Sequence, residues 1–138
     1  MDYEEIKDFI NERDAFCTHM GIEIVEVGKG RATAHMQVGP QHLNCFGIVH
    51  AGALFSLADA AFGAAANSHG PQSLAVNVTA AFVKPGLEGR LTATAHEVAP
   101  GNKLSTYAIE IADAAGKIIA AFQGTAYQRK APFPPVSS

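Results

Sequence analysis

Apolar side chains recur at two different periods along the chain, and the change of period separates an N-terminal segment from the rest. Between residues 2 and 20 the apolar positions lie near helical spacing, and acidic residues gather at the start, where they favour the positive end of a helix dipole. These apolar positions are Tyr3, Ile6, Phe9, Ile10 and Phe16. The pattern predicts an amphipathic helical segment over residues 1–20.

From residue 21 onward the apolar period is two, which is typical of strands with one buried face. Ala32, Ala34 and Met36 share one face, for example, and the short turn-forming stretches 28–30, 100–102 and 113–116 favour antiparallel hairpins. The predicted strands cover 21–27, 31–38, 73–83, 89–99, 103–112 and 117–128. The proline-rich segment 131–138 is expected to be a flexible tail.

A second helix is predicted between the two groups of strands, over residues 51–68, where Asp59 is the only ionisable side chain. At about 100° per residue one broad face of this helix is apolar and Asp59 falls at its edge. The residues of that face are Leu54, Leu57, Ala58, Ala61, Phe62 and Ala65. The economical fold is α+β, with a curved antiparallel sheet wrapped around one long central helix.

A small sheet cannot cover so apolar a helix completely, so we expect a homodimer that continues the sheet. Small residues on both faces of the last strand favour further assembly into a homotetramer. They include Ala120, Ala121, Thr125 and Ala126.

Composition narrows the classes of function. A length of 138 residues fits one main domain, predicted over 21–130, and 48% hydrophobic residues can fill its core. The net charge of −3 argues against a nucleic-acid partner, and the central Asp59 with its Ala and Gly neighbours argues against a membrane span. The acidic N-terminus and two cysteines outside any metal-binding spacing indicate a cytoplasmic protein without a metal or other cofactor.

The chemistry of the chain is concentrated between residues 44 and 59. The loop from Asn44 to Gly52 delivers backbone N–H groups to the start of the central helix, which favours an oxyanion or a polarised carbonyl as the guest. Asp59 follows two turns further along the helix. An isolated carboxylate near such donors indicates acid–base or nucleophilic chemistry.

These residues resemble the signature of hotdog-fold acyl-CoA thioesterases of the phenylacetic acid degradation type. The likeness extends over about residues 20–129 and includes the strand that ends at Lys84, Pro85 and Gly86. Its motif residues here are Asn44, His50-Ala51-Gly52, the run from Leu54 to Phe62, and Asn67-Ser68.

The resemblance implies hydrolysis of an acyl-CoA thioester to a free acid and CoA, at sites shared by two subunits. The backbone N–H of Ala51 and the side chain of Asn44 would hold the carbonyl, and Asp59 of the opposite subunit would act as general base or as nucleophile. Phenylacetyl-type or medium-chain acyl groups would be the substrates. Residues expected to bind or orient substrate are His50, Gly52, Phe46, Phe55, Asn77, Lys84 and Arg90, the last two through the CoA phosphates.

The chain departs from the family pattern at two points. Ala51 replaces the first glycine of a usual His-Gly-Gly, which is compatible with an N–H donor at helical angles but adds a methyl group beside the carbonyl. A Ser or Thr that orients water in some relatives falls near Ala75, and Ser73 or Asn77 is the candidate substitute. Two alternatives stay open: a hydratase of enoyl or hydroxyacyl thioesters on the same fold, and a non-catalytic acyl-CoA-binding protein.

Overall fold

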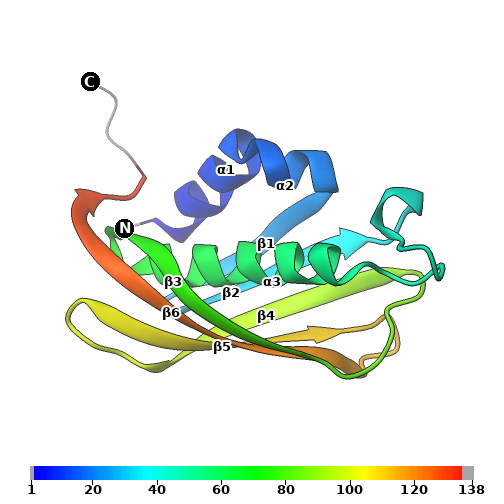
Figure 1. The fold of residues 1–138 in the computed structure, drawn as a ribbon. Coiled ribbons are helices and arrows are strands. Elements are labelled where there is room, and N and C mark those ends of the chain that lie inside the picture. Colours follow the sequence, from blue (N-terminus) through cyan, green and yellow to red (C-terminus); the bar gives the residue numbers. More distant parts are fainter. Residues whose placement is uncertain (1, 135–138) are drawn as a thin grey trace.

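The computed structural model describes residues 2–134 as one antiparallel sheet of six strands, with one long helix on its concave side (Figure 1). The helices are α1 (Tyr3–Arg13), α2 (Ala15–Met20) and α3 (Ala51–Ala66), with 3-10 turns at Pro40–His42 and Asn67–His69. The strands are β1 (Ile22–Gly28), β2 (Arg31–Gln37), β3 (Pro71–Phe82), β4 (Arg90–Ala99), β5 (Leu104–Ala112) and β6 (Ile118–Pro132), in the spatial order β1-β2-β4-β5-β6-β3.

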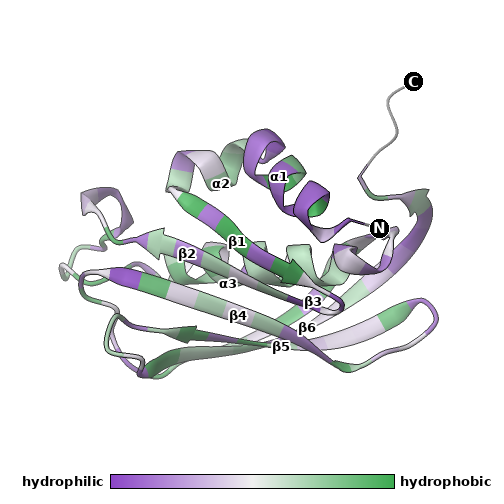
Figure 2. Ribbon diagram, turned by 180° about the vertical axis from the view of Figure 1, so that it is seen from behind, coloured by the Kyte–Doolittle hydropathy of each residue, from purple (hydrophilic) through white to green (hydrophobic). Residues whose placement is uncertain are grey.

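Helix α3 forms the centre of the core. Its predicted apolar face is buried, as are the inward-facing Ala32, Ala34 and Met36 of β2. Figure 2 shows α3 as hydrophobic along its length, whereas hydrophilic and hydrophobic residues alternate on α1. The curved sheet around a central helix is therefore confirmed. Within residues 2–134, no helix has the length and apolar character needed to cross a membrane.

A glycine on β6 allows α3 to approach the sheet closely. A Cβ atom at Gly124 would lie 2.7 Å from the ring of Phe62, which is itself 2% exposed. The same ring packs against Tyr107 of β5, with 5.5 Å between the ring centroids. The contact between Phe62 and the bare backbone of Gly124 thus sets the depth at which the helix sits in the sheet.

The N-terminal segment is two helices rather than one. Asp14 has extended backbone angles and separates α1 from α2: its N–H donates to the carbonyl of Ile10, and its carboxylate accepts from the N–H of Cys17. A single residue therefore caps the end of one helix and the start of the next. The break turns Phe16 out of the apolar face, and its side chain is 58% exposed.

Hairpins form where the short turns predict them, between β1 and β2, β4 and β5, and β5 and β6. Strand β6 continues to Pro132, beyond the predicted end at 128, because it pairs with β3 as far as Pro71. Phe133 then packs edge-on against Phe9 of α1 at a centroid distance of 5.4 Å. The first residues of the predicted tail therefore belong to the fold, and residues 135–138 lie outside the described residues.

Strand β3 lies at the edge of the sheet with only β6 as a neighbour. Most of its length is exposed, including the apolar side chains of Leu74, Val76 and Phe82. A long edge strand with exposed apolar residues is a surface on which another strand can pair.

We expect Gly124→Ala to destabilise the fold by about 1–3 kcal/mol, because the added methyl group must displace the buried ring of Phe62. Urea unfolding followed by circular dichroism measures the change. Gly63→Ala is the matched control, since a Cβ atom at Gly63 meets nothing within 4 Å and alanine favours a helix. Equal stability of the Gly124 variant and the native protein would show that the sheet adjusts freely around α3.

Candidate active site

The side chain of Asn44 shapes the loop before α3. Its Oδ1 atom accepts hydrogen bonds from the backbone N–H groups of Phe46, at 2.9 Å, and Ile48, at 3.3 Å. The backbone N–H of Asn44 donates to the carbonyl of Ile48 at 2.8 Å, which closes the loop. Within residues 2–134 the amide nitrogen of Asn44 has no hydrogen-bond partner, so it is free to donate to a ligand.

His50 is the N-cap of α3 and acts as a positioning residue. Its Nδ1 atom accepts from the N–H of Gly52 at 2.8 Å, which fixes the ring against the first turn of the helix. A side chain at Gly52 would crowd this bond, because a Cβ atom there would lie 3.0 Å from Nδ1. His50 and Gly52 therefore organise the start of the helix, and the N–H of Gly52 is already used.

The N–H of Ala51 is the donor left over at the start of α3. The N–H groups of Ala53 and Leu54 donate to the carbonyl of His50, and that of Gly52 donates to the His50 ring. Ala51 is exposed, and its N–H has no partner in the described part of the chain. Because Ala51 is the first residue of a helix, alanine fits there without strain and presents its N–H as a glycine would.

The loop and the helix start share a hollow of about 370 Å³ with the segment that follows β3. Asn44 and Ala51 line it together with Leu54 and Lys84, so three of the predicted site residues are brought together here. The remaining lining residues are Ile48, Val49, Phe82, Val83, Pro85 and Gly86. This hollow combines an apolar wall with two unused N–H donors and one cation.

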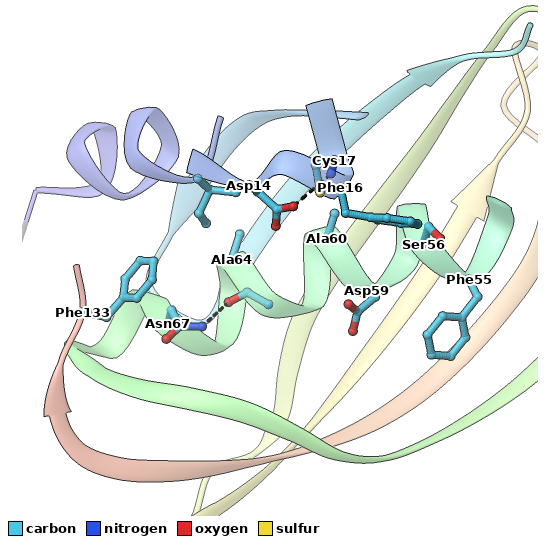
Figure 3. Close-up of a pocket in the computed structure, with 12 residues that line it drawn as sticks. Asp14, Phe16, Cys17, Phe55, Ser56, Asp59, Ala60, Ala64, Asn67 and Phe133 are labelled. Carbon is cyan, nitrogen blue, oxygen red and sulfur yellow. Dashed lines mark hydrogen bonds between the residues drawn. The ribbon is translucent and has the colours of Figure 1, made fainter. Parts of the chain in front are cut away.

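Asp59 lines a different hollow, of about 400 Å³, between α3 and the N-terminal helices. Figure 3 shows its carboxylate projecting from α3, with Phe55 one turn nearer the helix start. Phe55 is 40% exposed and packs edge-on against Phe122, with 6.3 Å between the ring centroids. Phe55, one of the residues expected to bind substrate, therefore lines the same hollow as Asp59.

The surroundings of Asp59 raise its pKa above the ordinary value. Partial burial is the main cause, and the negative charge of Asp14 across the hollow adds to it. The carboxylate accepts no hydrogen bond from the described residues, and no Lys, Arg or His lines its hollow. Asp59 is therefore a stronger base than an ordinary surface aspartate.

Asp59 and the free donor of Ala51 lie on one helix but do not face a common point in one chain. Asp59 is eight positions beyond Ala51, which corresponds to about 12 Å along a helix axis. They also line separate hollows. A thioester carbonyl held at Ala51 is therefore out of reach of the same chain's Asp59.

Other predicted residues lie outside both hollows. Phe46 is at the tip of the loop and is 82% exposed, Asn77 is exposed on the edge strand opposite Thr125, and Arg90 begins β4 opposite Gln37. Ser73 is buried, and its N–H donates to Oδ1 of Asn67 at 2.8 Å. In a single chain, these four residues do not join the groups around Ala51 or Asp59.

Helices α1 and α2 supply a wall of the Asp59 hollow that is not predicted from the sequence. Ile10, Asp14, Phe16 and Cys17 line it, although they lie more than forty residues away in the sequence. Cys17 is an inert part of this wall, since burial is the main cause that raises the pKa of its thiol to about 12. Asp14 is the residue in the sequence that could have indicated this wall, because aspartate favours helix caps and so marks a possible break between two helices.

Comparison with known proteins settles the family. The model of the thioesterase superfamily matches residues 46–120, which include the loop from Phe46 onward, α3 and β3 but not Asn44. This chain belongs to the thioesterase superfamily. As a member it is a thioester hydrolase, and the hotdog fold and the motif resemblance are both confirmed.

Individual thioesterases match most of the chain. The acyl-coenzyme A thioesterase PaaI of Escherichia coli is 40% identical over 85% of this chain and 84% of its own length. The solved structure of the E. coli PaaI protein from the phenylacetic acid degradation operon has a TM-score of 0.88 at 37% identity, covering 92% of this chain and 93% of that one. A mutant of the phenylacetic acid degradation protein PaaI of Thermus thermophilus has a TM-score of 0.79 at 32% identity, covering 83% and 98%.

The raised pKa of Asp59 gives a prediction about stability. The folded protein holds a proton on Asp59 more readily than the unfolded chain does, so the free energy of unfolding falls as the pH rises from 3.8 through the raised pKa. Asp59→Asn removes this ionisation. We expect the variant to be more stable than the native protein at pH 7, with the difference narrowing as the pH approaches 3.8.

Urea unfolding at pH 7 and pH 4 measures both differences. Asp8→Asn, at an exposed position on α1, is the control and should show a much smaller effect. A variant at position 59 that is less stable than the native protein at pH 7 would contradict the electrostatic description of the hollow.

Proposed function

We propose that this thioesterase hydrolyses acyl-CoA to a free acid and CoA, in sites that two protomers share. One protomer supplies the N–H of Ala51 and the amide of Asn44, and its partner supplies the carboxylate from position 59. The observation that carries the proposal is the separation of Ala51 and Asp59 into two hollows on one helix. A two-fold axis that sets two copies of α3 antiparallel would bring each donor to the other chain's carboxylate.

The edge strand supports such a dimer. Pairing of β3 with its copy would satisfy the unpaired edge and cover Val76 and Phe82. A second apolar surface supports a homotetramer: Tyr127 of β6 lies in register with Leu74 of β3 and with Leu104 of β5, and all three side chains are exposed. Residues directly opposite on neighbouring strands share a face of the sheet, so these three form one patch.

In the proposed mechanism the thioester carbonyl oxygen accepts hydrogen bonds from Ala51 and Asn44. These donors stabilise the negative charge that develops when the carbonyl carbon is attacked. Asp59 takes a proton from an attacking water, or its carboxylate attacks directly and forms an anhydride that water then opens. In either case the C–S bond breaks, and the CoA thiolate leaves and takes up a proton.

The substrate class follows from the relatives and from the lining of the two hollows. The E. coli relative is named an acyl-coenzyme A thioesterase, and the similar structure is that of a phenylacetic acid degradation protein, which favours phenylacetyl-type acyl groups, with medium chains as the alternative. Lys84 lies at the Ala51 hollow, where it is placed to attract the CoA phosphates. An acyl-CoA substrate and the free thiols of Cys17 and Cys45 support a cytoplasmic location.

Asp59→Asn should lower hydrolysis by at least about 100-fold, because it removes the base or the nucleophile. Release of free thiol from a panel of aromatic and aliphatic acyl-CoAs measures the loss, and circular dichroism and gel filtration check that fold and assembly are intact. Turnover close to the native rate in the variant would rule out the role of Asp59. No thiol release by the native protein from any acyl-CoA would rule out the proposed substrate class.

Mixing Asp59→Asn subunits with Asn44→Ala subunits tests whether the sites are shared. A mixed dimer would contain one site built entirely from native residues, so random mixing should restore about a quarter of the native rate. Each variant alone is the control, after the same unfolding and refolding. Mixed dimers that are verified by mass spectrometry and remain inactive would place the whole site in one chain.

A further inference from the structure

The hollow beside Asp59 has a wall that lies outside the part of the chain matched by the thioesterase family model. That model covers residues 46–120, whereas Asp14, Phe16 and Cys17 come from the N-terminal helices. The geometry points to α1 and α2, together with the side of α3 that faces them, as the part of the enzyme that selects the acyl group. Phe16 and Gly63 would set the space for it, and Asp14 would exclude negatively charged acyl groups. This inference rests on the proposed function.

The position and size of the hollow suit an acyl group. Asp59 lines this hollow and, in the proposed mechanism, acts at the thioester carbonyl. The acyl group attached to that carbonyl would therefore extend into the hollow. Its volume is about 400 Å³, whereas a cavity of about 150 Å³ is enough to hold benzene. There is therefore room for a ring and the short chain that links it to the carbonyl.

The two long sides of the hollow differ in a way that leaves a slot. On one side Phe16 extends from α2 along α3 towards Ser56, and its ring is 58% exposed (Figure 3). On the other side α3 presents the small residues Ala60, Gly63 and Ala64. A Cβ atom at Gly63 would meet nothing within 4 Å, so open space lies directly above the helix backbone. A flat group that entered this slot would cover the Phe16 ring.

The charges around the slot are all negative. Asp14 and Asp59 are the only ionisable carboxylates of its lining, and no cation lines it within residues 2–134. The carboxylate of Asp14 is fixed, because it accepts the N–H of Cys17 at 2.9 Å and so caps α2. A second carboxylate on the acyl group would be repelled by both residues, whereas an uncharged acyl group would not.

Equilibrium binding tests the slot without depending on turnover. In the Asp59→Asn background, calorimetry measures the affinities for phenylacetyl-CoA and acetyl-CoA, which differ by the phenyl ring. We expect phenylacetyl-CoA to bind more tightly. Phe16→Ala, which removes a partner of the ring, and Gly63→Leu, which fills its space, should each reduce the ratio of the two affinities about 10-fold.

Both substitutions are at positions where truncation or added volume leaves the core intact, and His19→Ala, also exposed on α2 but outside the hollow, is the matched control. The control should leave the ratio unchanged. The inference is overturned if, in both test variants, the ratio of the two affinities stays within about twofold of its value in the Asp59→Asn background. That result would not contradict the proposed hydrolysis of acyl-CoA by the native enzyme. A native protein that hydrolyses no acyl-CoA would instead refute the proposed function.

The charge of Asp14 is tested with glutaryl-CoA and pentanoyl-CoA, whose acyl groups have the same length and differ by a carboxylate. Asp14→Asn keeps a side-chain oxygen that can cap α2, since Asn and Asp are comparable N-cap residues. We expect it to raise the affinity for glutaryl-CoA relative to pentanoyl-CoA about fivefold or more in the same background. An unchanged ratio would show that Asp14 serves α1 and α2 only as a cap.

Discussion

The apolar surface of α3 is the constraint from which the rest of the structure follows. The sixteen residues of α3 include one ionisable side chain, so nearly the whole circumference of this helix must be covered from water. The sheet curls around one face, and α1 and α2 cover part of another (Figure 1). The side that carries Phe55 and Asp59 is left between these two covers, and a hollow of about 400 Å³ remains there.

The sequence predicts those parts of the fold that depend on neighbouring residues. The period of two along β2 and the hairpins at short turns are local, and both match the structure. The break at Asp14 is not predicted, because an aspartate inside a helix costs less than about 1 kcal/mol and packing of α2 against the core decides the outcome. The place of β3 beside β6 depends on contacts between residues that lie from 38 (Phe82 and Ala120) to 61 (Pro71 and Pro132) positions apart, which no local pattern encodes.

The candidate site also has parts that the local sequence predicts and parts that depend on distant contacts. Asn44, His50 and Ala51 lie within eight residues of one another, and the loop before a helix start is readable as a set of N–H donors. Asp59 stands out because it is alone in an apolar segment. The place of Phe16 in the hollow is not predicted, because its spacing in the sequence continues the apolar stripe of α1. Only the helix break at Asp14 turns its side chain towards solvent. Asn77 was expected from its place near Ala75 in the family likeness and Arg90 from its charge, and in a single chain both lie outside the two hollows.

Gly63 has a consequence for how enzymes of this kind diverge. Glycine within a helix lowers stability by about 1 kcal/mol relative to alanine, and no neighbouring atom requires its small size. A methyl group there would meet no neighbouring atom within 4 Å, so alanine would be tolerated by the fold. If the hollow holds the acyl group, the volume open to that group can therefore change through one residue, without compensating changes in the core.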